Sequence, residues 1–277
     1  MQKYNIPCIS TSAFAKLCNT NKRTLIHYDE IGLFKPSYTD EKGYRYYSES
    51  QCDVFFTITC LKDLGMPLKE IKTYIDNRNP SDLTALLLDQ KKKVEQELLH
   101  LKRIQKVIET KLSLVTEGAK ISFRDRCSKP FLEEFPEEIF IATPYLGTNH
   151  HDRIISALSD HIGYVNHEHL NTGHPYGAVM SVQDLKEGIT DHYAYFITKV
   201  SGASDAHNVL VKPAGLYAVI YLKGDYYLAE EAFQTLLNFI NNQDLAAGEF
   251  CYKEAVWDEL TMQSVDDYIT RISIPVR

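Results

Sequence analysis

The segment N-T-N-K-R-T-L-I-H-Y-D-E-I-G-L-F-K-P, residues 19–36, sets the architecture of the first part of the chain. Its first three residues predict a tight polar turn. The helix that follows is expected over residues 22–31, because Gly32 ends it and Pro36 cannot continue it. A preceding helix is expected over residues 12–18. Two short helices joined by such a turn are typical of a helix-turn-helix.

The residues that follow predict a β-hairpin and two more helices. Aromatic strand-forming residues lie on both sides of the turn D-E-K-G at 40–43, which gives a wing over residues 37–47. The sequence S-E-S-Q at 48–51 has capping-box spacing and opens a third helix that runs to residue 62. After the break L-G-M-P at 64–67, a fourth helix is expected over residues 68–76. Residues 1–78 therefore predict a winged helix-turn-helix domain.

A heptad pattern marks the next segment, residues 79–118. Apolar residues recur every seven positions, at Leu87, Val94, Leu101, Ile108 and Val115. The pattern predicts one helix of roughly 36 residues and 54 Å. A lone helix of this length cannot bury its stripe, and the stripe is narrow and flanked by charges, so we expect an intermolecular coiled coil. Packing of the helix on its own domain is the alternative.

Charge divides the chain into a mildly basic part and an acidic part near residue 118. The first part holds 18 Lys and Arg against 15 Asp and Glu, and the second holds 12 against 22. A basic module can bind the phosphates of nucleic acid, whereas an acidic module repels them and is expected to have a different function. The sequence contains no run of 18 apolar residues and no secretory pattern, and its six cysteines are scattered, so we expect a cytoplasmic protein with free thiols and no membrane partner.

Three motifs and the long helix together resemble the MerR family of bacterial transcription regulators over residues 9–118. The motifs are T-L-x-x-Y-D-E-I-G-L-F-K-P at 24–36, G-Y-R-Y-Y at 43–47 and L-K-D-L-G-M-P-L-K-E-I at 61–71. The resemblance implies a homodimer joined by an antiparallel coiled coil. It also implies binding to promoter DNA with an over-long spacer, whose distortion lets RNA polymerase use both promoter elements. Ile26 departs from the family's usual Arg, and Arg23 can replace that contact from one turn earlier.

The predicted DNA contacts come from the second helix, the wing and the third helix. The candidate residues are Lys22, Arg23, Thr24, His27, Tyr28, Lys42, Arg45, Tyr46 and Lys62. We expect the first three to enter a major groove and the next two to face a sugar-phosphate strand. The three later cations are spaced to touch flanking phosphates. For Tyr46 and its neighbour Tyr47, packing between wing and helix is the alternative.

The acidic part predicts an internal repeat. Residues 139–200 and residues 217–276 share one order of strand, helix, strand and hairpin return. Two such units give an α+β domain over residues 119–277 with a pseudo-twofold axis and a cleft between the halves. This layout resembles the GyrI-like effector-binding domain. Its position after a MerR-type helix resembles the multidrug-responsive branch of the family, typified by BmrR.

A candidate ligand site is centred on the segment F-C-Y-K-E-A-V-W at 250–257. Alternation places Glu254 in an apolar and aromatic row, where an unpaired carboxylate is costly, and an aromatic cleft with one acid favours a small hydrophobic cation. The resemblance places Glu254 at the family's buried acid and Tyr268 at a pocket tyrosine. Further candidates for the walls are Tyr252, Tyr145, Tyr176, Tyr193, Tyr226 and Tyr227. Pairing of Glu254 with Arg271 or a lysine, or a solvent-facing side chain, is the alternative.

Catalytic and metal chemistry find little support in the sequence. The motifs G-x-S-x-G and H-E-x-x-H and a glycine-rich phosphate loop do not occur. Residues 76–81 contain no cysteine, where metal-sensing members of the resembled family hold thiols. We therefore expect no cofactor, no metal and no enzyme. A hydrolase activity of the GyrI-like domain, with Glu254 as general base, is the alternative function.

Overall fold

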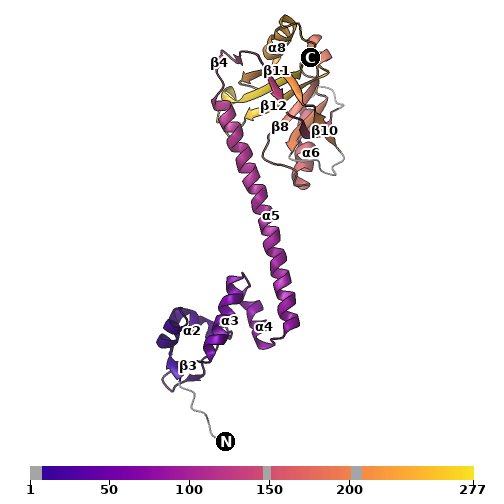
Figure 1. The fold of residues 1–277 in the computed structure, drawn as a ribbon. Coiled ribbons are helices and arrows are strands. Elements are labelled where there is room, and N and C mark those ends of the chain that lie inside the picture. The colour runs from indigo at the N-terminus through magenta and orange to yellow at the C-terminus, as the bar shows by residue number, and fades with distance from the viewer. Residues whose placement is uncertain (1–7, 146–150, 201–207) are drawn as a thin grey trace. The chain divides into compact units, whose positions relative to one another are not determined.

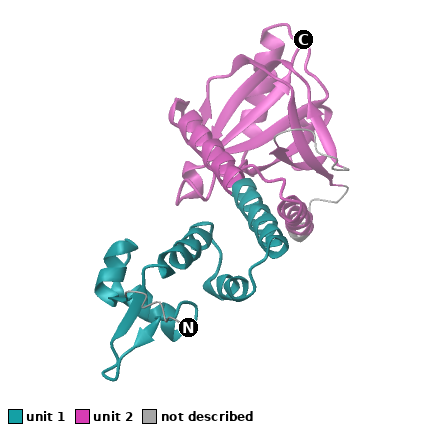
Figure 2. Cartoon of the chain, turned by 60° about the horizontal axis from the view of Figure 1, so that its bottom comes forward, with its two compact units in different colours: residues 1–100 teal, residues 101–277 magenta. Residues whose placement is uncertain are grey.

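A computed structural model describes residues 8–145, 151–200 and 208–277 (Figure 1). The chain divides into two compact units, Met1–His100 and Leu101–Arg277, and Figure 2 shows that the division falls within one long helix. Among the described residues, no helix is long and apolar enough to cross a membrane.

The N-terminal unit is a helix-turn-helix with a wing. Its elements are β1 (Cys8–Ser10), α1 (Thr11–Leu17), α2 (Lys22–Glu30), β2 (Tyr38–Thr39), β3 (Arg45–Ser48), α3 (Gln51–Asp63) and α4 (Leu68–Asp76). Asn19 adopts a φ of 48° in the turn, and the Asn21 side chain caps α2 by accepting from the Thr24 N–H at 2.8 Å. The strands pair in the order β1-β3-β2. The predicted order of elements is confirmed, although α3 begins at Gln51 rather than at residue 48.

Aromatic stacking holds the wing on the helices. The Tyr47 ring centroid lies 4.8 Å from that of Phe14 and 5.6 Å from that of Phe34, and Phe55 of α3 contacts the same cluster. Tyr47 is fully buried, so the packing alternative is correct for this residue. Tyr46 instead lies half-buried beside Tyr38, and its hydroxyl is 3.4 Å from Asp40 in the wing.

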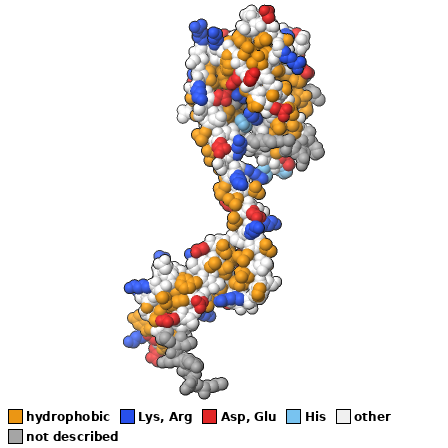
Figure 3. All heavy atoms as spheres, viewed as in Figure 1, with side chains coloured by type: hydrophobic (Ala, Val, Ile, Leu, Met, Phe, Trp, Pro, Cys, Tyr) orange, Lys and Arg blue, Asp and Glu red, His pale blue; other side chains and the backbone are white. Residues whose placement is uncertain are grey.

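Helix α5 runs over Pro80–Ala119, 40 residues that span about 60 Å at 1.5 Å per residue. Its apolar stripe lies in solvent in the single chain, and Figure 3 shows hydrophobic side chains exposed along it. Both Leu101 and Ile108 expose about half of their surface, at 51% and 53%. On another face, Thr110, Leu114 and Gly118 are buried against the C-terminal domain. The alternative of packing on the helix's own domain therefore holds for that face, whereas the heptad stripe is left uncovered.

The C-terminal unit is built around one antiparallel sheet. Its elements are β4 (Phe123–Arg124), β5 (Cys127–Ser128), β6 (Phe131–Phe135), β7 (Glu138–Pro144), α6 (His151–His167), β8 (Tyr176–Ser181), α7 (Val182–Lys186), β9 (Tyr195–Val200), β10 (Val209–Lys212), β11 (Gly215–Lys223), α8 (Glu230–Asn242), β12 (Phe250–Trp257), the 3₁₀ helix η1 (Val265–Asp267) and β13 (Ile269–Pro275). The strand order is β10-β7-β9-β8-β12-β13-β11-β5-β4, and β6 pairs with β11. The halves β7-β9-β8 and β12-β13-β11 mirror each other across the β8–β12 pair, which confirms the predicted repeat.

The two faces of this sheet carry separate cores. Helices α6, α7 and α8 pack on one face, where Cys251 of β12 lies among their apolar residues. Leu114 of α5 packs on the other face with Tyr252 and Val256 of the same strand. Because neighbouring residues of a strand point to opposite faces, the position of a side chain along β12 determines which core it joins.

Candidate functional site

The beginning of α2 presents cations to solvent. Lys22 and Arg23 are exposed in its first turn, and His27 is exposed one turn later. Thr24 is half-buried, and its hydroxyl lies 3.2 Å from the capping Asn21 Oδ1. Tyr28 is only 4% exposed, and its ring packs 6.2 Å from that of Phe55, so it belongs to the core. This corrects the expectation that the Tyr28 side chain faces a sugar-phosphate strand.

The wing and α3 carry the other predicted cations. Lys42 lies exposed at the tip of the wing, and Lys62 lies exposed near the end of α3. Arg45 is half-buried because its Nε donates to Asp29 Oδ2 of α2 at 2.7 Å. This ion pair joins the wing to α2. The placement gives Arg45 a structural role that the sequence analysis did not anticipate.

A cavity of about 620 Å³ opens in the C-terminal unit, within the range typical of small-molecule sites. Its aromatic lining consists of Tyr176, Tyr226, Tyr227, Tyr268 and Trp257. Residues of α5 and α6, of the segment before β8, of β9, η1 and β13, and of the loops after β11 and β12 also line it. The one tryptophan of the sequence therefore lies in the cavity wall, where it can report on binding.

The charges around this cavity are predominantly negative. Among the described residues, the lining holds three carboxylates, Asp225, Asp258 and Glu259, and one ammonium group, that of Lys111. The Lys111 Nζ lies 3.4 Å from Asp258, so the charges of these two side chains cancel each other. Burial lowers the pKa of His174, another lining residue, to about 4, which leaves its imidazole neutral at pH 7. An aromatic wall with surplus carboxylates favours a cationic ligand.

Half of the predicted ligand residues lie in this cavity and half lie elsewhere. Tyr176, Tyr226, Tyr227 and Tyr268 line it. Tyr145 and Tyr193 are buried beside Phe196, with ring centroids 5.4 and 5.7 Å from it. Tyr252 and Glu254 point to the opposite face of the sheet. None of these four residues lines this cavity. For Tyr252 and Glu254 the reason is that strand alternation alone does not tell which face of the sheet carries the cavity.

The acids of the cavity were missed because they lie on loops. Asp225 precedes the tyrosine pair 226–227, and its Oδ1 accepts from the Tyr227 N–H at 2.9 Å. Glu259 follows the tryptophan by two positions and is exposed. The sequence did contain one sign of this site, because acidic and aromatic residues are adjacent in D-Y-Y at 225–227 and in W-D-E at 257–259.

Glu254 is the centre of a buried ion-pair network. Its two carboxylate oxygens accept from Lys212 Nζ and from Arg271 Nη2, each at 3.1 Å. Lys212 Nζ also lies 2.9 Å from Glu138, which in turn binds Lys199. The expectation that Glu254 lacks a partner is therefore wrong, and the alternative of pairing with Arg271 and a lysine is correct.

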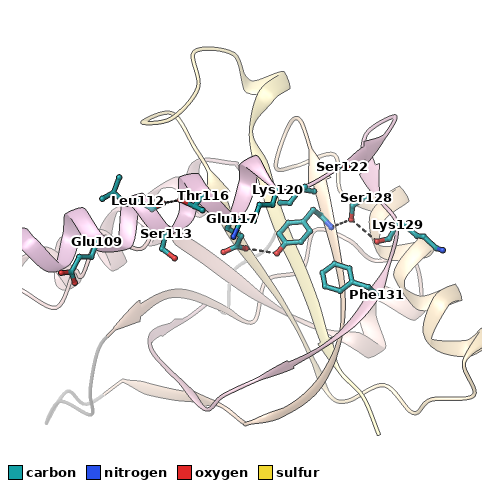
Figure 4. Close-up of a pocket in the computed structure, with 12 residues that line it drawn as sticks. Glu109, Leu112, Ser113, Thr116, Glu117, Lys120, Ser122, Ser128, Lys129 and Phe131 are labelled. Atoms are coloured by element: carbon teal, nitrogen blue, oxygen red, sulfur yellow. Dashed lines mark hydrogen bonds between the residues drawn. The ribbon is translucent and has the colours of Figure 1, made fainter.

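The network continues to α5. The Glu117 carboxylate accepts from Arg271 Nη1 at 3.1 Å and from the Tyr221 hydroxyl at 2.9 Å. Figure 4 shows Glu117 at the wall of a second cavity, of about 800 Å³, between the end of α5 and the sheet. Burial opposes ionisation of Glu254, but the charges of Arg271 and Lys212 outweigh it and lower the pKa of Glu254 to about 2. A carboxylate that is ionised and saturated in this way is poorly suited to act as a general base.

Comparison with known proteins agrees with these two modules. Residues 9–78 match the MerR HTH family of regulatory proteins. The chain is also 33% identical over 268 residues to the multidrug-efflux transporter 2 regulator of Bacillus subtilis (strain 168), which covers 97% of this chain and 96% of the relative. The chain belongs to the MerR family.

Two further known proteins match most of the length of this MerR-family chain. The multidrug-efflux transporter 1 regulator of Bacillus subtilis (strain 168) is 25% identical, over 97% of each chain. Among solved structures, a cryo-electron microscopy structure of an EcmrR–DNA complex covers 97% of this chain and 99% of that chain, at 18% identity and a TM-score of 0.43. At the level of the family, the chain is a DNA-binding transcription regulator.

Proposed function

We propose that this chain is a homodimeric transcription activator whose C-terminal domain binds small hydrophobic cations. The carrying observation is the aromatic, acidic cavity of about 620 Å³ in a chain that also has a winged helix-turn-helix. The names of two relatives, which regulate multidrug-efflux transporters, support a response to structurally varied compounds. Such a regulator works in the cytoplasm, where promoter DNA and RNA polymerase are found.

The cavity suits a lipophilic cation for three physical reasons. Its aromatic rings provide apolar area for the body of the ligand and negative π faces for its charge. In the described lining, the one ammonium group is that of Lys111, which is held by Asp258 and leaves Asp225 and Glu259 in excess. Behind the wall, the buried Lys253 lies 3.6 Å from the Tyr226 ring centroid and interacts electrostatically with Asp225, but burial lowers the pKa of Lys253 to about 7 and so reduces its charge at neutral pH. The partly enclosed position strengthens the attraction between these carboxylates and a bound cation relative to open water.

DNA binding in this proposal depends on placed cations and on two copies of the chain. The predicted contacts are Lys22, Arg23, Thr24, His27, Lys42, Arg45, Tyr46 and Lys62, without the buried Tyr28. The net charge of the basic part is small, so two half-sites must be bound at once for useful affinity. The proposed dimer joins the apolar stripes of two α5 helices in an antiparallel coiled coil. Binding of a ligand to the dimer would change the free energy available to distort the promoter spacer. The distorted spacer would let RNA polymerase use both promoter elements.

Tetraphenylphosphonium is the probe that tests the cavity. We expect it to change the fluorescence of Trp257 saturably, whereas the neutral triphenylphosphine oxide binds much more weakly. Asp225→Asn removes a charge from the lining with little change of shape, so the affinity for the cation should fall about tenfold, which is roughly 1.4 kcal/mol. Affinity for the neutral probe should change less than twofold.

The matched control for this titration is Asp244→Asn, which removes a carboxylate outside the cavity lining. Asp244 has a φ of 55°, a conformation that asparagine also tolerates. Equal affinity of wild type for both probes, or no fluorescence response to either, would contradict the proposed ligand class.

Salt dependence tests the DNA surface. Lys62→Ala should weaken operator binding to a similar extent on different sequences and should reduce the slope of log K against log salt by about 1, because one phosphate contact is lost. Lys106→Ala on α5 is the control, since it removes an equal charge from an exposed position outside the winged domain. Fluorescence anisotropy at several salt concentrations measures both slopes, and an unchanged slope for Lys62→Ala would remove this residue from the interface.

A further inference from the structure

Lys212 occupies a complete receptor for an ammonium group inside the C-terminal domain. Its side chain is fully buried, and its Nζ lies 2.9 Å from Glu138 Oε2 and 3.1 Å from Glu254 Oε2. Three aromatic rings surround the same atom, with centroids at 4.5 Å for Phe135, 5.1 Å for Tyr217 and 5.1 Å for Tyr252. Two carboxylates and three ring faces are the groups that a protein uses to bind an organic cation.

The wider network balances the charge of this receptor. Lys199 binds Glu138, and Arg271 binds Glu254, so each carboxylate has a second cation in addition to Lys212. Arg271 lies on the interior strand β13 and is also held by Glu117. Among the residues that the structure describes, Lys212 alone contacts both carboxylates and all three rings, which makes it the occupant of the site rather than part of its wall.

The strand that carries Lys212 lies at the edge of the sheet. Of the strands that the structure describes, only β7 pairs with β10, and Val209 and Val211 of β10 are 40% and 46% exposed. A surface cavity of about 610 Å³ is lined by Val211 and Pro213, on either side of Lys212 in the chain, and by Tyr217 and Tyr252. An external amine could therefore reach two of the three rings from solvent if the lysine side chain were absent.

We propose that Glu138, Glu254, Phe135, Tyr217 and Tyr252 form a binding site for a primary alkylammonium group, and that Lys212 is its built-in occupant and closes it to external amines. Lys212 is thus a specificity-determining residue of the effector domain, because it keeps Glu254 from any cation that enters the domain. This inference rests on the proposed effector-binding function and deepens it. The selection of cationic effectors then depends on Asp225 and Glu259 in the other cavity.

Chemical rescue tests the proposal in the full chain. Lys212→Ala removes the three outer carbons and the amine, which together correspond to n-propylammonium. The variant should melt several degrees below wild type, and millimolar n-propylammonium should restore most of this loss in a saturable way. The isosteric neutral molecule n-propanol should not restore it, and wild type should gain nothing from n-propylammonium beyond the effect of an equal concentration of sodium chloride.

Two outcomes would overturn the proposal. The first is a Lys212→Ala variant that gains no more from n-propylammonium than from n-propanol. The second is an equal gain in wild type and variant, which would indicate a nonspecific salt effect. The rescue involves neither DNA nor an effector, so its failure is distinguishable from failure of the tetraphenylphosphonium titration, which tests the proposed function.

A charge-balanced pair of variants covers the case in which Lys212→Ala does not fold. Lys212→Met leaves two buried carboxylates with one cation fewer, whereas Lys212→Met with Glu254→Gln removes one charge of each sign. We expect the double variant to melt above Lys212→Met, although it carries one more substitution. A double variant that melts at or below the single one would show that the lysine does not neutralise Glu254, and it would contradict the assigned site.

Discussion

Replacement of Leu101 and Ile108 by Asp should convert the protein into a monomer and abolish operator binding. Both residues lie on the exposed stripe of α5 and expose about half of their surface in the single chain, so the substitutions should leave the fold of one chain intact. In the proposed coiled coil, each Asp would bury an unpaired charge in the seam, at a cost of several kcal/mol. With two such sites in each chain, the total cost exceeds the free energy of dimerisation that a moderate interface provides.

Sedimentation velocity measures this outcome directly, and anisotropy with operator DNA measures its consequence. Affinity for DNA should fall by more than a hundredfold, because a monomer engages a single half-site. The control carries the same number of new aspartates at Arg103 and Lys106, which are exposed positions of the same helix outside the heptad stripe. If the Leu101 and Ile108 variant still sediments as a dimer, the stripe is not the dimer interface.

Replacement of Glu254 by Gln should destabilise the folded protein by about 3 kcal/mol, the usual scale for removing one partner of a buried ion pair. The side chain is 11% exposed and bonds two cations. The substitution leaves the three cations of the network with two carboxylates, Glu138 and Glu117, and so with one uncompensated positive charge. From the sequence alone, an unpaired Glu254 predicted the opposite sign, a gain of stability without ligand. The contacts reverse this expectation.

The pH dependence of stability provides a second measurement on the same variant. The folded-state pKa of Glu254 is lowered from 4.5 to about 2, so the folded chain binds fewer protons than the unfolded chain in this range. Its stabilising contribution is complete above pH 4.5 and is lost as the pH falls toward 2. The urea midpoint of wild type should therefore fall as the pH is lowered over this interval. The midpoint of Glu254→Gln should fall less.

The control for both measurements is Glu137→Gln, an exposed carboxylate next to the network residue Glu138. We expect its midpoint in urea to stay close to that of wild type, because a surface charge contributes little. A Glu254→Gln variant as stable as Glu137→Gln would mean that the network contributes no net stability.

Local patterns were sufficient to predict the order and type of most elements. The polar turn after residue 18, the glycine at 32 and the break at residues 64–67 are signals read over a few residues, and the observed helices α2 and α4 follow them closely. The heptad repeat predicted α5 to within a residue or two at each end. The internal repeat of the second domain was also visible, because a strand and a helix each leave a periodic pattern.

The faces and partners of individual side chains required the tertiary structure. Alternation along β12 showed that Tyr252 and Glu254 share a face, but both faces of this sheet carry a core, so alternation could not tell which face borders the cavity. The partners of Glu254 come from position 212 on an edge strand and position 271 on another strand, and a single sequence contains no local sign of such distant contacts. Periodicity reports the environment along one element, whereas ion pairs and cavities arise where separate elements meet.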